Sequence, residues 1–196
     1  MKSVAIALAV VLSAVSLAAD AQTQTRVRGT ISSVSGDTLA LKTDEDKAFE
    51  IQVNDKTNII FGQPLALTDI KSGDFIAVTS VRRKDGSLVA YDIRRMMKPT
   101  NPGHRPFDGR DDQTMTNATV SATVGDTKGR ELVLSYEGGS QKVVVADTAV
   151  ISALAPGQRS QLVPGSYASV IAEAAADGKL TARSIEVRKE TPKAPM

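Results

Sequence analysis

The side chains best suited to binding a metal lie close together near the middle of the chain: Met96, Met97, His104 and Met115. Thioether sulfur and imidazole nitrogen suit Cu(I) best among the common metals. Met96 and Met97 are adjacent, so on a strand they would point to opposite faces and could not easily serve one site. The pattern therefore indicates a candidate copper site. The alternative is that the methionines only pack and that His104 bonds a backbone carbonyl.

The same stretch, residues 96–116, does not have the composition of a free tether. It mixes Pro, Phe, His, Arg and Asp, whereas flexible linkers are rich in Gly and Ser. It is also longer than the commonest connections, which have about 2–6 residues. We expect a structured connector that acts as a clasp first and as a ligand site second. Phe107 would be its apolar anchor, and Arg105 would pair with a carboxylate such as Asp108 or with carbonyl groups at strand ends.

The residue types used in catalysis are present, but the sequence does not arrange them as an active site. The chain has no cysteine, and no Gly-x-Ser-x-Gly sequence holds a serine for His104 to activate. Asp111 and Asp112 stand in a polar stretch, where solvation leaves carboxylates unperturbed. We therefore predict a non-enzymatic binding or structural module. Copper binding is the alternative function, and a hydrolase is a distant third.

Charge and aromatic content argue against a nucleic acid as the partner. Lys and Arg number 24 against 22 Asp and Glu, and aromatic residues make up 4% of the chain. This balance provides no basic field for a phosphate backbone, and few rings on which bases could stack. We expect the partner to be a periplasmic protein or a small ligand, whose identity the sequence leaves open.

The first 21 residues have the pattern of a secretory signal peptide. Lys2 precedes an apolar run from Val4 to Ala18, and Ala19-Asp20-Ala21 fits the small-x-small cleavage rule. The run is shorter than the roughly 20 apolar residues that span a bilayer. We therefore predict export to the periplasm or beyond, with Gln22 as the first residue after cleavage. No later apolar run is long enough to cross a membrane.

Two β-patterned stretches, residues 22–95 and 117–188, look like copies of one another. Residues 73–93 align with residues 165–185 without a gap, and seven of the 21 positions are identical, including both turn glycines and the Asp-Gly turn. Short strands that alternate apolar and polar side chains suit small closed barrels. The predicted fold is all-β, with two tandem duplicated OB-like β-barrels joined by the structured connector. We expect residues 189–196, which are polar and contain proline, to form a disordered tail.

These motifs resemble a known family. The pattern includes Gly29 to Val34, Thr57, Gly73-Asp74 and Asp85 to Ile93, and it returns less completely in residues 118–185. It is similar to the bacterial exported domain of unknown function 5666, in a two-repeat member. The resemblance implies a small OB-like barrel and a periplasmic location. It implies no catalytic residue, substrate or cofactor.

Overall fold

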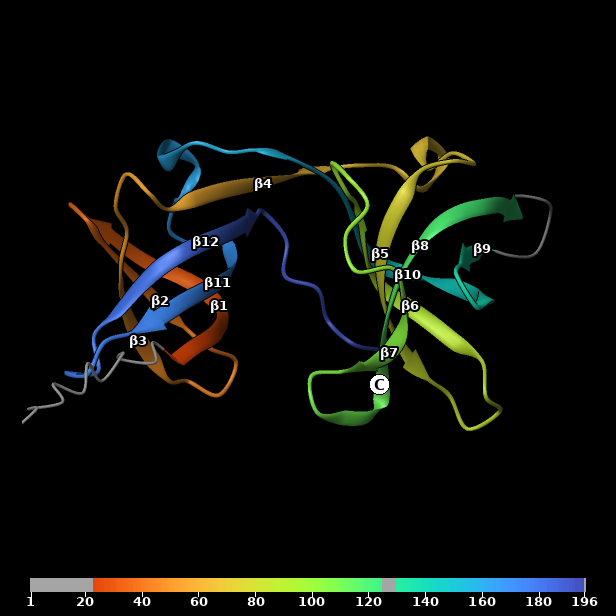
Figure 1. The fold of residues 1–196 in the computed structure, drawn as a ribbon, viewed down its shortest axis with the longest axis horizontal. Helices are drawn as coiled ribbons and strands as arrows, with labels where there is room; N and C mark the ends of the chain where they lie inside the picture. The colour runs from red at the N-terminus through yellow and green to blue at the C-terminus, as the bar shows by residue number, and fades with distance from the viewer. Residues whose placement is uncertain (1–22, 125–129, 196) are drawn as a thin grey trace, which may run out of the picture.

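The computed structural model describes residues 23–124 and 130–195, which form strands joined by turns (Figure 1). The predicted all-β class is confirmed, and the predicted signal peptide lies outside the described residues. Two short 3-10 turns, η1 (Leu67–Asp69) and η2 (Arg159–Gln161), are the helical pieces of the described part. The strands are β1 (Thr23–Ser35), β2 (Thr38–Lys42), β3 (Ala48–Gln52), β4 (Asn58–Pro64), β5 (Phe75–Arg82), β6 (Leu88–Arg95), β7 (Gly103–Phe107), β8 (Arg110–Val124), β9 (Glu131–Tyr136), β10 (Gly139–Pro156), β11 (Tyr167–Ala174) and β12 (Leu180–Arg188).

The strand pairings close two rings, and each ring takes strands from both halves of the sequence. In the first ring, β1 pairs with β2 and β11, β2 pairs with β3, and β12 joins β3 to β11. In the second ring, β5 pairs with β6 and β8, and the first part of β10 joins β6 to β9, which pairs with β8. The rings therefore do not coincide with the two units expected at residues 22–95 and 117–188.

Two crossing strands account for this difference. β4 and the last part of β10 carry the chain from one ring to the other, and they pair with each other in antiparallel fashion (Figure 1). Gly62 lies opposite Leu154 in this pairing, and these two residues are 92 positions apart in the sequence. The same spacing relates the flanking pairs, because Ile59 faces Ile185 on one side and Ile151 faces Ile93 on the other. The contacts that the first half of the chain makes here are thus repeated by the second half, so the crossing strands lie on a local two-fold axis between the halves.

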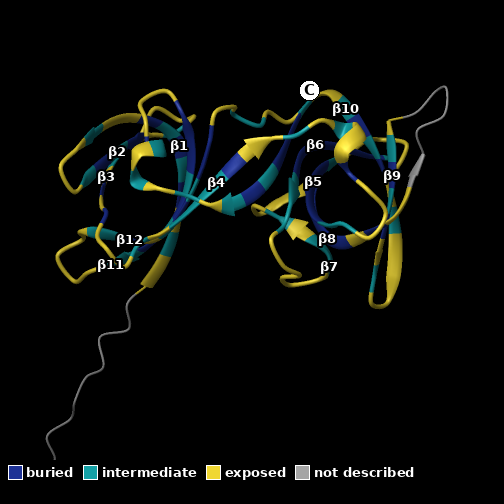
Figure 2. Ribbon diagram, turned by 90° about the horizontal axis from the view of Figure 1, so that it is seen from above, coloured by how far each residue is buried: buried dark blue, intermediate teal, exposed yellow. Residues whose placement is uncertain are grey.

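Each ring encloses its own apolar core, which the alternation of side chains along its strands produces. In the first ring, Leu39, Leu41 and Ile185 are fully buried. In the second ring, Val78 and Ile93 are fully buried. Buried positions follow the inner faces of both rings (Figure 2). Two separate cores built by one interleaved chain mean that neither half of the sequence can complete a core alone.

No helix in the described residues combines the length and the apolar character needed to cross a bilayer.

The interleaving predicts cooperative unfolding. Ile93→Ala and Ile185→Ala each empty a fully buried site, one in each ring, and each should lower the free energy of unfolding by about 2–5 kcal/mol. Because melting of either half removes strands from both rings, calorimetry should show one transition for the wild type and for both variants. Val163→Ala, at a position 47% exposed, serves as the control and should change little. Two separable transitions in the wild type would contradict the interleaved arrangement.

Candidate binding cleft

A cleft of about 760 Å³ lies between the two rings. The first ring contributes Arg26 and Arg28 of β1 and Tyr167 of β11, and the second ring contributes Tyr91 and Gln113. Basic side chains outnumber acidic ones in its lining. The cleft has the size of small-molecule sites, which occupy roughly 300–1,000 Å³. Both rings are needed to form it, because each supplies one wall.

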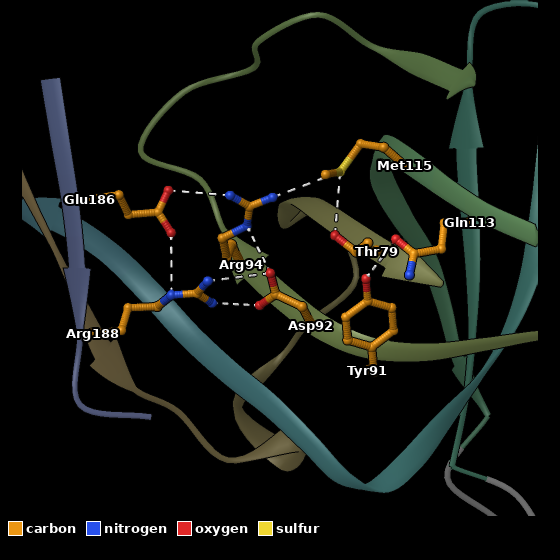
Figure 3. A network of polar contacts seen from close by, with 8 residues as sticks. All are labelled: Thr79, Tyr91, Asp92, Arg94, Gln113, Met115, Glu186 and Arg188. Carbon is orange, nitrogen blue, oxygen red and sulfur yellow. Dashed lines mark hydrogen bonds and ion pairs between the residues drawn. The ribbon is translucent and has the colours of Figure 1, made fainter. Parts of the chain in front are cut away.

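A buried network of alternating charges lies beside the cleft (Figure 3). Asp92 on β6 accepts two hydrogen bonds from Arg188 on β12, at 2.5 and 3.4 Å. Glu186 on β12 accepts a hydrogen bond from Arg94 Nη1 at 3.2 Å. The side chains of Arg188 and Asp92 are only 5% and 8% exposed. The network therefore joins a strand of the second ring to a strand of the first through two carboxylates and two guanidinium groups.

Two contacts within the network depend on charge more than on hydrogen-bond geometry. Arg94 Nε lies 3.6 Å from Asp92 Oδ2, and Arg188 Nε lies 3.4 Å from Glu186 Oε1. Neither nitrogen has a hydrogen-bond partner among the described residues. Burial lowers the pKa of Arg94, but the carboxylates of Asp92 and Glu186 outweigh burial and raise that pKa overall. The two carboxylates therefore keep Arg94 in its charged form.

The network fits against the crossing strands because β4 has a glycine, Gly62, where β4 and β10 pair. A Cβ atom on Gly62 would lie 2.5 Å from Cγ of Arg188, so only glycine allows the arginine to pass over β4. On its other side, the Arg188 guanidinium lies 5.5 Å from the centre of the Tyr167 ring, which is a cation–π distance. Arg94 and Glu186 are 92 positions apart, so corresponding positions of β6 and β12 carry opposite charges and pair.

A row of neutral polar groups continues the wall of the cleft in the second ring (Figure 3). The Tyr91 hydroxyl donates to Gln113 Oε1 at 3.2 Å, and the Thr79 hydroxyl points at the sulfur of Met115 at 3.8 Å. Burial, helped by the nearby charge of Asp92, raises the pKa of Tyr91 to about 12. Tyr91 is therefore a neutral donor at ordinary pH.

Two of the predicted copper ligands, His104 and Met115, lie on opposite faces of the paired strands β7 and β8. Met115 lies in the polar wall, where Arg94 Nη2 approaches its sulfur at 3.8 Å. His104 Nδ1 lies 2.8 Å from the hydroxyl of Thr116, and Thr116 and Met115 point to opposite faces of β8 because they are adjacent. Met97 is 54% exposed, and Met96 is half-buried where β6 ends. Partial burial and the positive charge of Arg82 lower the pKa of His104.

Among the described residues, no group of three or more His, Cys, Asp or Glu side chains is placed to hold a metal ion.

The predicted clasp takes a different form from the one expected. The turn between β7 and β8 reaches β1 of the first ring, where Arg28 pairs with Asp108 at 2.5 Å and lies 4.9 Å from the centre of the Phe107 ring. Arg105 does not pair with Asp108. It donates to the carbonyl of Asn101 at 3.1 Å, inside its own connection. Phe107 and Asp108 therefore span the two rings through Arg28, while Arg105 braces the loop.

Residues 189–195 also differ from the expected disordered tail. They follow β12 as an extended segment without regular structure, and Thr191 to Ala194 line the cleft.

Sequence reasoning missed the role of this segment in the cleft, and it also missed the charged network. A signal for the network was present, because Asp92-Ile93-Arg94 and Glu186-Val187-Arg188 both read acid, apolar, arginine. Each triplet places an acid and an arginine on the face of a strand opposite its core residue.

Removing one carboxylate from the network should be costly. Asp92→Asn keeps the shape of the side chain but leaves Arg188 buried beside a neutral group, so the free energy of unfolding should fall by about 3–5 kcal/mol. Asp111→Asn, at an exposed position with no ion pair in the described structure, is the matched control and should be nearly neutral. Urea denaturation of the two variants measures the difference. Equal, small effects would show that the network adds little to stability.

The clasp should be weaker than a core contact. Phe107 is half-buried against Arg28, so Phe107→Ala should lower the free energy of unfolding by only about 0.5–2 kcal/mol, the range of a cation–π contact. Release of the turn should also speed trypsin cleavage after Arg110 in the native state. Met97→Ala, at an exposed position, is the control and should leave the cleavage rate unchanged. An unchanged rate in the Phe107 variant would mean that the turn does not hold the rings.

Comparison with known proteins agrees with the resemblance noted in the sequence. No curated protein and no solved structure matches the chain. Residues 28–94 match the family model described as "Domain of unknown function (DUF5666)". The matched region runs from β1 to β6 and so contains strands of both rings. Residues 28–94 therefore form a region similar to the DUF5666 family.

Proposed function

We propose that the protein is a non-enzymatic, exported binding module whose ligand site is the cleft between the two rings. The observation that carries this proposal is the cleft of about 760 Å³, which has one wall from each ring. Ligand sites commonly form where two structural units meet. In such a site, Tyr91, Gln113 and the cationic side chains would orient the ligand, and the buried charges of Asp92 and Arg188 would keep the walls in place.

The chemistry of the lining favours binding over catalysis. The Asp92 carboxylate contacts the guanidinium groups of both Arg188 and Arg94. It is therefore poorly placed to act as a general acid or base. The single histidine is not among the residues that line the cleft. The copper alternative has less support, because His104 and Met115 lie on opposite faces of paired strands.

The finer description of the fold belongs to the same proposal. We interpret the rings as two small OB-like barrels of a duplicated chain that has exchanged strands between its halves. The support is the repeated register, in which Ile59 with Ile185 and Ile151 with Ile93 are corresponding pairs. Export is supported by the signal-like sequence of residues 1–21, and it places the ligand in the periplasm or outside the cell.

A thermal-shift screen with a blocked cleft tests the proposal. The probes are citrate, glutamate, glycerol phosphate and synthetic hexapeptides of mixed charge. Ser169 lines the cleft on β11, so Ser169→Trp should fill it, whereas Lys84→Trp adds the same ring at the exposed turn between β5 and β6. At least one probe class should raise the melting temperature of the wild type and of the Lys84 variant, but not of the Ser169 variant, because bound ligand stabilises the folded state.

Circular dichroism should first show that both tryptophan variants keep the wild-type fold. Binding that survives Ser169→Trp would place the ligand elsewhere. A complete absence of binding across the probe classes would count against a binding function.

A further inference from the structure

The segment after β12 lies where a ligand of the cleft would lie. It leaves the first ring at Arg188 and runs through the space between the rings (Figure 1). Thr191, Pro192 and Pro195 are half-buried, and residues 191–194 form part of the lining. Within the described structure, no hydrogen bond or ion pair joins residues 189–195 to the rest of the chain. The segment is thus held by van der Waals contacts with the walls of the cleft, without polar contacts that would fix its position.

Its charge also fits the cleft poorly. Arg26 of β1 lines the cleft, and it has no carboxylate partner in the part of the chain that the structure describes. Partial burial and the positive charges of Arg28 and Arg94 lower the pKa of Arg26, and the more distant carboxylates of Glu186 and Asp108 offset only part of this effect. The charged residue that the segment brings into the lining is Lys193, another cation. Among the described residues, Arg26 therefore has no carboxylate in direct contact while the segment is in place.

We propose that the cleft binds an extended segment of a partner protein that carries a carboxylate for Arg26, and that residues 190–195 occupy this place until the partner displaces them. This inference rests on the proposed function, because it names the ligand class of the same cleft. The cleft already holds one extended stretch of polypeptide, so its shape suits another.

The energetics of displacement are plausible for a tethered occupant. A short segment attached beside its own site has an effective concentration on the order of millimolar, so it competes even when its contacts are weak. Its two prolines, Pro192 and Pro195, restrict the free chain and reduce the entropy lost on docking. A partner segment needs only a modest gain to replace it. A carboxylate facing an unpaired arginine supplies such a gain, since charge-assisted hydrogen bonds are stronger than neutral ones.

The experiment separates the site from its occupant. In one variant, residues 190–195 are replaced by a Gly/Ser sequence, which empties the cleft and leaves both rings intact. The probes are three fluorescent peptides with the sequence of residues 189–196: the wild-type sequence, Lys193→Gln and Lys193→Glu. Fluorescence anisotropy should show binding to the Gly/Ser variant in the order Glu, Gln, Lys, with roughly fivefold between the first two, as one partly exposed ion pair gives. All three should bind the wild-type protein more weakly, because its own segment competes.

Arg26→Gln in the Gly/Ser background should abolish the preference for Glu over Gln while leaving the wild-type peptide bound. Arg83→Gln, at the exposed turn between β5 and β6, is the matched control and should leave that preference unchanged. A preference for Glu that persists in the Arg26 variant would overturn the assignment of Arg26. Equal binding to the wild-type and Gly/Ser proteins would overturn the role of the segment.

Failure of every peptide to bind the Gly/Ser variant at millimolar concentration would overturn the peptide inference as a whole. If small anions then still bind the wild type and lose that binding with Ser169→Trp, the proposed function of the cleft stands without it. If neither class binds, both fail.

Discussion

The pairing of β4 with the last part of β10 is the constraint on which the rest of this structure depends. These strands carry the chain between the rings, and their contact at Gly62 and Leu154 sets how the rings face each other. Since β12 pairs with β4 and β6 pairs with β10 on the two sides of this contact, the crossing strands also fix the positions of Glu186 and Asp92. The network lies at the junction that this pairing creates, and the cleft opens beside it.

The buried charges beside the crossing strands need a reason, because burying ions costs free energy that apolar residues would not. Their arrangement suggests specificity. Arg94 and Glu186 occupy corresponding positions of the two halves, so identical residues there would place like charges in contact. Arg94 of β6 and Glu186 of β12 meet across the crossing strands, and this contact is favourable only because the two halves carry opposite charges there. Gly62 extends the same asymmetry, because its counterpart Leu154 has a side chain and Gly62 leaves that space to Arg188.

The sequence predicted the strands well and their partners poorly. Alternation at Leu39, Leu41 and Ile93 marks inner faces, and the Asp-Gly turns mark hairpins, because both signals are local. Which strand closes a ring with which is a long-range choice, and the same local pattern fits a ring made by one half or by two. For a related reason, the sequence does not decide which of the candidate copper ligands share a face of the sheet. Proximity in sequence placed His104 near Met115, but one residue of register separates their faces on paired strands.

The two sides of the cleft differ in how firmly they are held. At the crossing strands, backbone pairing and side chains that are almost fully buried join the rings. At the β7–β8 turn, the rings meet through the partly exposed pair of Arg28 and Asp108, with side chains 24% and 47% exposed. Exposed pairs contribute little to stability and are weakened by salt. The contact at the turn is therefore the weaker of the two connections between the rings. A partner that supplies its own carboxylate to the arginines of β1 would compete with Asp108 for Arg28 as it enters, so entry and release of the clasp are coupled.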